Sequence, residues 1–330
     1  MPGGKEKMNW GIIGLGNIAK RFATSLIKNE DAYLYAVASY TEEKRDYFKK
    51  TYAPEVVYND YESLLNDYKV EAVYIALPHA MHKEYIIKAL EKKIAVLCEK
   101  PATMNAEDLI EIKKIAKENK TFFMEAIKTR FCPLIDDIKH AINEEKIIGD
   151  ITTISANFNS DVGEVVEGRY YIDPTQGGAL YDVGIYPVNF VIDMLGNEIV
   201  EIKSTMKSFK NYQTDDYFSA KLTFESGVVA CVEGAMDRNE PKVAIIQGTK
   251  GKIVVPVYYR PESYHVELND GISYTVEKTL EIDDMQGEIQ EVQNCFDQLK
   301  MESERLTIDE SIKMIQITDQ IRKKAKWIEA

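Results

Sequence analysis

Residues 9–19 read NWGIIGLGNIA and decide the fold. The apolar run Asn9–Ile13 is predicted as a strand, and a helical pattern follows the glycines. The turn between them fits G-x-G-x-x-G/A in the strand-to-helix context that this pattern needs. Gly14 allows a tight turn, Gly16 lets the backbone approach a pyrophosphate, and Ala19 lets helix and strand pack closely.

Backbone N–H groups at the start of this helix are candidates for holding phosphate groups. Asn17 and Ile18 follow the second glycine directly. Unpaired N–H groups and the helix dipole attract anions at a helix N-terminus. The motif therefore predicts dinucleotide binding. The alternative is a turn that uses small residues and holds no ligand.

The first part of the chain alternates strands with helices. Four further apolar runs are predicted as strands, namely Tyr33–Ser39, Ala72–Ala76, Ile94–Cys98 and Thr121–Glu125. Helical patterns lie between them, at Glu42–Thr51, His82–Glu91 and Ala106–Glu118, the last one capped by Asn105. Strands this apolar are typical of a parallel sheet covered on both faces. Repeated β-α-β units therefore predict an α/β, doubly wound Rossmann sheet.

The second part changes period beyond a boundary expected between Lys128 and Asp150. Tyr217–Phe224 alternates apolar and polar residues, and a turn leads into a second strand, Val228–Gly234. Another hairpin is predicted around GTKG at residues 248–251, with a helix near Gly178–Leu195 and further helices after Met285. We assign residues 8–128 to a dinucleotide-binding domain and 129–330 to a second, α+β domain.

Composition excludes several classes of protein. The 330 residues include 41 lysines and arginines against 54 aspartates and glutamates, a net charge of −13, which disfavours a nucleic-acid partner. No apolar run reaches the roughly 18 residues of a membrane span, and the start lacks a signal-peptide core. Four separated cysteines without a CxxC pair fit a cytoplasmic location. Met1–Lys7 is polar and could be an extension ahead of Met8, so we leave it out of the fold prediction.

The end of the second strand bears on the choice between NAD and NADP. An acidic residue there would bind the ribose hydroxyls of NAD. The chain instead has Ser39-Tyr40-Thr41, with Lys44 and Arg45 nearby to supply charge for a 2′-phosphate. We expect NADP to be preferred over NAD. The alternative is that Thr41 only caps the next helix and the two cations are solvated.

Two groups of residues are candidates for proton handling. Lys100 follows a strand and precedes Pro101, which can carry a cis peptide bond. Asp182 and Tyr186 are four apart and share a face if residues 178–195 are helical. An ammonium favours the deprotonated form of a nearby phenol, so a lysine and a tyrosine together can move a proton. Each residue taken alone is equally well explained as a surface or packing residue.

Two residues near this pair concern the shape of the helix. Pro187 cannot donate to the carbonyl of Val183, so a kink or break is expected there. Gly184 is expected to permit the close approach of another backbone segment.

His79 and His82 form H-x-x-H, but no third ligand is evident, so no metal site is predicted.

Taken together, these motifs resemble the glucose-fructose oxidoreductase / inositol dehydrogenase / MocA (Gfo/Idh/MocA) family. The likeness runs from Trp10 to the C-terminal helices and rests on GLGNIA at 14–19, LPHAMH at 77–82, LCEKP at 97–101 and GGALYDVGIY at 177–186. MEAIKTRFCP at 124–133 and RYYIDPTQGG at 169–178 are similar to the branch of dimeric dihydrodiol dehydrogenases and NADP-dependent xylose dehydrogenases. Most of the family has histidine where this chain has Tyr186, and the branch has tyrosine.

The resemblance implies that residues 129–330 form a substrate-binding and oligomerisation domain with an open, mostly antiparallel sheet. It also implies a homodimer or higher oligomer and a set of site residues. The catalytic residues it implies are Lys100, Asp182 and Tyr186. The cofactor-binding residues are Gly14, Gly16, Asn17, Ile18, Ser39, Tyr40, Leu77, Pro78, His79, His82, Glu99 and Lys100. Gln176 departs from the glycine of many relatives, and Arg130 and Arg169 are interpreted as structural.

The function implied is an NAD(P)-dependent dehydrogenase that acts on a CH–OH group of a sugar, cyclic polyol or trans-dihydrodiol. Tyr186 would be the general acid/base, Lys100 would assist it, and Asp182 would orient the substrate. One alternative is a dinucleotide-binding regulator without turnover. Another is a glycoside hydrolase that retains NAD, which the lack of an acid at Ser39 disfavours.

Overall fold

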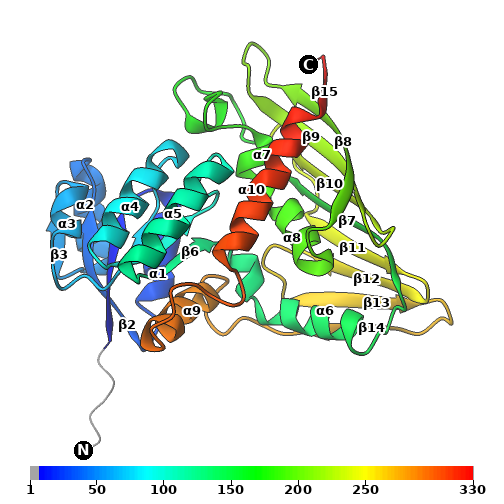
Figure 1. The fold of residues 1–330 in the computed structure, drawn as a ribbon, viewed down its shortest axis with the longest axis horizontal. Helices are drawn as coiled ribbons and strands as arrows, with labels where there is room; N and C mark the ends of the chain where they lie inside the picture. Colours follow the sequence, from blue (N-terminus) through cyan, green and yellow to red (C-terminus); the bar gives the residue numbers. More distant parts are fainter. Residues whose placement is uncertain (1–6, 330) are drawn as a thin grey trace, which may run out of the picture. The chain divides into compact units, whose positions relative to one another are not determined.

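The computed structural model describes residues 7–329 and divides the chain into two compact units (Figure 1). The excluded start of the chain, apart from Lys7, lies outside the described residues. The first unit runs to Ile127 and also includes Ile282–Ile312. The second unit comprises Lys128–Glu281 and the residues from Lys313 onward.

The first unit is built on a six-stranded parallel sheet in the order β3-β2-β1-β4-β5-β6. Its strands are β1 (Met8–Ile13), β2 (Ala32–Ala38), β3 (Val56–Tyr58), β4 (Ala72–Ile75), β5 (Ala95–Glu99) and β6 (Phe123–Ala126). Its helices are α1 (Asn17–Leu26), α2 (Glu42–Tyr52), α3 (Tyr61–Leu65), α4 (His82–Glu91), α5 (Ala106–Asn119) and α9 (Gln286–Asp297). This order and direction confirm the predicted Rossmann sheet.

Large side chains fill the core beside β1. Trp10, Phe22 and Tyr74 are fully buried, and the rings of Phe22 and Tyr74 stack with their centroids 3.7 Å apart. Burying side chains of this size contributes about 1.5–3 kcal/mol each. This packing holds α1, which follows the glycine turn, against β1 and β4.

Strand β3 and helix α3 were not predicted from the sequence. Val56–Tyr58 is only three residues long and half-buried, so it shows no periodicity. Asp60 caps α3 by accepting a hydrogen bond from the backbone N–H of Ser63 (2.7 Å). The predicted cap of α5 is confirmed, since Asn105 accepts a hydrogen bond from the N–H of Asp108 (2.9 Å).

The second unit is built on a nine-stranded sheet in the order β14-β13-β12-β11-β7-β10-β9-β8-β15. Within this sheet, as far as the structure describes it, only β7 with β10 and β8 with β15 pair in parallel. Its strands are β7 (Ile151–Asn159), β8 (Ile199–Ser208), β9 (Asp215–Phe224), β10 (Val229–Ala235), β11 (Val243–Gly248), β12 (Gly251–Pro256), β13 (Ser263–Leu268), β14 (Ser273–Glu277) and β15 (Ala325–Ile328). Both predicted hairpins are confirmed, and β7, β8, β13, β14 and β15 were not predicted.

Helices α6 (Pro133–Asn143) and α8 (Ile185–Leu195) lie on one face of this sheet (Figure 1). Apolar side chains of β9 point to that face and are almost completely buried, as the alternation predicted: Phe218, Ala220, Leu222 and Phe224. Helix α10 (Ile308–Lys323) ends in the second unit, where the Ser204 hydroxyl donates to the carbonyl of Ile321 (2.6 Å).

The helix predicted over residues 178–195 is two helices. Helix α7 (Ala179–Asp182) ends before Val183, and α8 begins at Ile185. Pro187 lies in the first turn of α8, where its missing N–H has no helical acceptor, and the carbonyl of Val183 instead accepts from the N–H of Tyr186 (3.3 Å). The chain therefore breaks ahead of the proline.

The close approach expected at Gly184 comes from the ring of Phe218 and from the backbone carbonyl oxygen of Leu180 in α7. A Cβ atom on Gly184 would collide with the ring of Phe218, and so would a Cβ atom on Gly234 in β10. Two glycines thus make room for one fully buried ring on β9.

Candidate functional site

The predicted cofactor residues of the first unit follow four neighbouring parallel strands. Gly14 follows β1, Ser39 follows β2, Leu77 lies just beyond β4, and Lys100 follows β5. Because parallel strands have their carboxyl ends at one edge of the sheet, these residues share that edge. Ligands bind at this edge in open α/β sheets.

The glycine turn is fixed to the strands on both sides of β1. The N–H of Gly14 donates to the carbonyl of Ala38 (3.1 Å), and the N–H of Ala76 donates to the carbonyl of Ile13 (2.9 Å). Gly14 has a φ of +86°, and a Cβ atom there would collide with the carbonyl oxygen of Ala76. Any other residue would therefore strain the turn and force β1 and β4 apart.

Gly16 leaves the space that a dinucleotide needs. It caps α1 without a side-chain hydrogen bond, and nothing lies within 4 Å of the position of a Cβ atom. The first turn of α1, starting with Asn17 and Ile18, presents N–H groups toward that space. The residues present thus fit a bound pyrophosphate.

The end of β2 carries a cation that is held in place. Nη1 of Arg45 donates to the carbonyl of Ser39 (2.7 Å), and the Ser39 hydroxyl accepts from the N–H of Thr41 (3.2 Å). Tyr40 is exposed and packs edge-to-face on Tyr61, with ring centroids 4.6 Å apart. Thr41 is the N-cap of α2 but makes no side-chain capping bond.

His82 links the loops that follow β4 and β5. Its side chain is fully buried, with Nε2 2.9 Å from the carbonyl oxygen of Leu77 and Nδ1 3.0 Å from that of Pro101. Burial, with help from neighbouring His79, lowers the pKa of His82 to about 4. His82 is therefore a neutral, buried ring that contacts both loops. Pro78, which follows Leu77 in the loop after β4, is exposed.

Lys100 lies at the carboxyl end of β5 and precedes Pro101 through a cis peptide bond, as the sequence allowed. Its N–H donates to Oε2 of Glu99 (3.2 Å), and Oε1 of Glu99 accepts a hydrogen bond from the hydroxyl of Tyr74. The side chain of Lys100 is half-buried. The backbone that carries it is thus tied to the core of the sheet.

Asp182 and Tyr186 lie in the second unit, one on each side of the break between α7 and α8. Oδ2 of Asp182 accepts a hydrogen bond from the hydroxyl of Tyr170 (3.2 Å). The ring of Tyr186 stacks on Phe158 of β7, with centroids 4.9 Å apart and planes 17° apart. Both residues are half-buried and each is held by an aromatic side chain.

Three aromatic residues at this place were not singled out from the sequence. Phe158, Tyr170 and Tyr259 contact the candidate pair, and the ring of Tyr259 lies 5.7 Å from that of Tyr186. Nζ of Lys128 lies 5.8 Å from the centroid of Tyr259. Tyr170 stands in a quoted motif, but no pattern marked the other two because 28 and more residues separate them from Tyr186.

The remaining residues named from the sequence have local partners. Arg130 is buried, with Nε donating to Asn189 (3.0 Å) and Nη1 3.2 Å from Asp193, both on α8. Gln176 donates to Asp173 (2.9 Å), and Arg169 is exposed. All four cysteines are free. Over residues 7–329 there is no cluster of metal ligands, and no helix is long and apolar enough to cross a membrane.

Comparison with known proteins gives matches over nearly the whole chain. Residues 8–126 match the oxidoreductase family with an NAD-binding Rossmann fold, GFO_IDH_MocA, and residues 136–254 match the GFO/IDH/MocA C-terminal domain. D-xylose 1-dehydrogenase (NADP(+)) of Hypocrea jecorina is 30% identical over 96% of this chain and 92% of that protein. Trans-1,2-dihydrobenzene-1,2-diol dehydrogenase of Mus musculus is 30% identical over 77% of this chain and 76% of that protein.

Solved structures share the fold. A 3-ketoreductase from Actinomadura kijaniata in complex with NADP and TDP-benzene has a TM-score of 0.89 at 23% identity, covering 98% of this chain and all of that one. An aldose-aldose oxidoreductase from Caulobacter crescentus has a TM-score of 0.87 at 20% identity, covering 97% of each chain.

Alanine substitutions of Gly14 and Gly16 are expected to change different properties, stability at Gly14 and NADPH affinity at Gly16. Gly16→Ala keeps the melting temperature within about 2 °C, because its φ is −82° and its Cβ atom meets nothing within 4 Å. It weakens NADPH binding at least about tenfold, since the methyl group fills the space for the pyrophosphate. Gly14→Ala instead lowers the melting temperature by several degrees. Fluorescence titration and calorimetry check both, and NADPH affinity unchanged in Gly16→Ala would contradict the assignment.

His82 is expected to stay neutral down to a pH of about 4. Its pKa is about 6.5 when unfolded and about 4 when folded, so its contribution to stability is complete above pH 6.5 and is lost as the pH falls toward 4. That contribution is about 3 kcal/mol. NMR titration gives the midpoint of His82, whose signal is identified by its absence in His82→Asn. A midpoint above 6 would disprove the assignment.

Proposed function

The chain belongs to the Gfo/Idh/MocA family of NAD(P)-dependent oxidoreductases, and from that premise we propose that it oxidises or reduces a CH–OH or carbonyl carbon of a sugar, cyclic polyol or trans-dihydrodiol. The observation that carries the proposal is the combination of a spacious glycine turn with Lys100 at the end of β5 and with Asp182 and Tyr186 around the α7–α8 break. A regulator that only senses cofactor has no need of a lysine, a carboxylate and a phenol for proton handling.

Three side chains share the work in this proposal. When bound, the nicotinamide supplies or accepts the hydride. Tyr186 gives a proton to, or takes one from, the reacting oxygen as general acid/base. Lys100 donates a hydrogen bond to the same oxygen and stabilises the deprotonated form of the phenol. Asp182 accepts hydrogen bonds from substrate hydroxyls and so orients the reacting carbon.

NADP is the proposed preferred cofactor. No carboxylate follows β2 before Glu42, so the position that would bind the ribose hydroxyls of NAD is not acidic. Arg45 is held by the carbonyl of Ser39 through Nη1, which leaves its other N–H groups available for a charge-assisted bond.

Free cysteines also support a reducing, cytoplasmic location.

The catalytic roles lead to a prediction about turnover. Lys100→Ala and Tyr186→Phe each lower turnover at least about 100-fold, in the range of general acid–base contributions. The measurement is the reduced-nicotinamide absorbance with a panel of aldoses, polyols and dihydrodiols and with each cofactor. Arg130→Lys serves as a control in the same unit, with turnover expected to stay within a few-fold of wild type.

The same screen separates the alternatives. Near-normal rates in either variant would refute the roles given to these side chains. Tight NADPH binding without turnover on any substrate would favour a regulator. Retained NAD with glycoside cleavage and no net cofactor consumption would favour a hydrolase.

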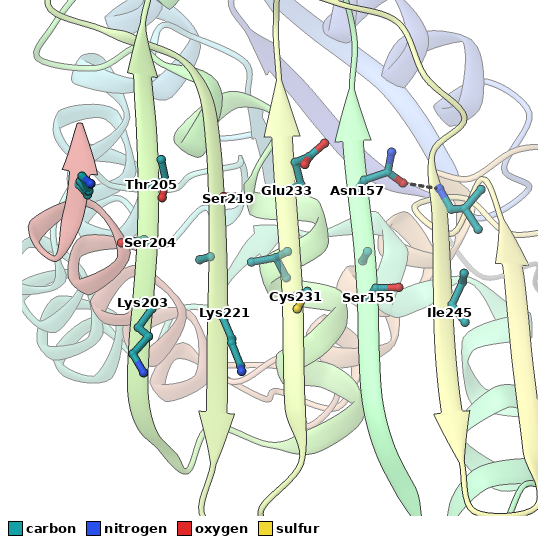
Figure 2. A pocket seen from close by; sticks show the side chains of 15 residues that line it. Ser155, Asn157, Lys203, Ser204, Thr205, Ser219, Lys221, Cys231, Glu233 and Ile245 are labelled. Carbon is teal, nitrogen blue, oxygen red and sulfur yellow. Dashed lines mark hydrogen bonds between the residues drawn. The ribbon is translucent and has the colours of Figure 1, made fainter. Parts of the chain in front are cut away.

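We further propose that a second copy of this chain covers the open face of the nine-stranded sheet. A hollow of about 670 Å³ lies on this face and is lined by residues of six adjacent strands, from β11 to β15 in the order of the sheet. Figure 2 shows the side chains that line it. Lys203 and Lys221 lie on β8 and β9, Glu233 and Cys231 lie on the neighbouring β10, and the small or apolar side chains of Ser155 and Ile245 follow on β7 and β11. Such a face, uncovered within one chain, suits a self-complementary contact.

Cys231 is a natural probe of this contact because it is exposed on that face, whereas the other three cysteines are buried. Light scattering is expected to give a dimer or higher oligomer, and Ile245→Glu is expected to shift it toward monomer. The thiol of Cys231 should react with a thiol reagent several-fold faster in Ile245→Glu than in the wild type, while Cys231→Ser removes the fast phase. A monomeric wild-type protein with a fast-reacting thiol would contradict the proposal.

A further inference from the structure

A buried carboxylate lies at the start of the segment that carries the candidate acid/base pair. Asp215, the first residue of β9, is completely buried. Its Oδ2 accepts a hydrogen bond from the N–H of Leu180 (2.8 Å), in the first turn of α7. Its Oδ1 accepts a hydrogen bond from Nη2 of Arg322 (2.6 Å), in the last turn of α10.

The ion pair contacts the chain at several consecutive positions ahead of Asp182. Gly178 has a φ of +107°, and a Cβ atom there would collide with Oδ1 of Asp215. Nη2 of Arg322 also donates to the carbonyl of Gly177 (3.4 Å), and its guanidinium lies 4.6 Å from the ring centroid of Tyr181. The carboxylate thus occupies the space that a side chain at residue 178 would fill.

Asp182 is connected to this pair through the backbone. The N–H of Asp182 donates to the carbonyl of Gly178 (3.0 Å). Tyr181, its neighbour, donates from its hydroxyl to Oδ1 of Asp319 on α10 (3.0 Å). Residues 177–182 are therefore held on one side by β9 and on the other by α10.

The charged form of Asp215 depends on its partner. Burial raises the pKa of Asp215, and the nearby Arg322 guanidinium opposes that shift. Removing one partner from a buried pair leaves an uncompensated charge. Loss of the Asp215 carboxylate removes the acceptor for the N–H of Leu180, and loss of Arg322 removes the donor to the carbonyl of Gly177 and leaves Asp215 without its cation.

We propose that Asp215 and Arg322 are positioning residues, which fix residues 177–180 and so aim Asp182 and Tyr186 at the substrate. The proposal rests on the proposed function, because it assigns these two residues to the reaction. Neither Asp215 nor Arg322 contacts the reacting atoms in this scheme. Their effect on the rate passes through the orientation of α7 and of the break that follows it.

The experiment compares Asp215→Asn, Arg322→Met and Arg322→Lys with the wild type and with Asp216→Asn. Asp216 is the matched control because it is adjacent, also buried and also paired, with Oδ2 3.4 Å from Nζ of Lys207. Asp215→Asn and Arg322→Met are expected to lower kcat at least tenfold per folded molecule, with NADPH affinity within twofold of wild type. Arg322→Lys is expected to recover at least threefold over Arg322→Met, and Asp216→Asn to stay within twofold of wild type.

A second measurement keeps the proposal testable if no substrate is turned over. Hydrogen exchange is expected to accelerate at least tenfold at the amides of residues 180–186 in Arg322→Met, and to stay unchanged there in Asp216→Asn. Unchanged exchange at these amides would overturn the proposal whatever the activity. So would an unchanged kcat with a lowered melting temperature, which would mean a purely structural pair. A wild-type enzyme without turnover on any substrate, but with the expected exchange, would instead reject the proposed function.

Discussion

The first unit depends on one close contact, in which the backbone of Gly14 packs against the carbonyl oxygen of Ala76. It lets β1 turn directly into α1 while β4 runs alongside, so the free N–H groups of the helix begin at the edge where the strands end. Gly16 can then leave its space open because Gly14 has already made the turn. Without this contact, the residues after β2, β4 and β5 would still share one edge of the sheet. The phosphate-binding turn at the start of α1 would not lie at that edge.

The second unit solves a different problem, which is to hold two side chains steady on a chain that is not one regular helix. A single ring, Phe218, fits beneath Gly184 and Gly234, and this lets the α7–α8 segment lie close to the sheet. The ring of Tyr186 is fixed by stacking on Phe158 of β7. Rigid aromatic contacts of this kind hold a phenol in one orientation at little cost in side-chain entropy.

Much of the fold follows from local patterns, and the site follows only in part. The turn at Gly14, the hairpin at Phe224 to Val228 and the apolar parallel strands are predictable, because each depends on residues close together in sequence. The helix was expected to break at Pro187, and the break lies about one turn earlier. The reason is that proline has no N–H to donate to the carbonyl of Val183, four positions before it. Asp215 and Phe158 carry no local signal, because their partners on α7 and α8 are more than 25 residues away. Long-range contacts of this type need the tertiary structure.

The ring of His82 has a consequence for the two loops it joins. A neutral imidazole carries a single N–H, yet both of its nitrogens face carbonyl oxygens, those of Leu77 and Pro101. Each tautomer can therefore tether only one loop, and the other carbonyl is left facing a lone pair. The loops that follow β4 and β5 share one proton between them, so tightening one of them loosens the other.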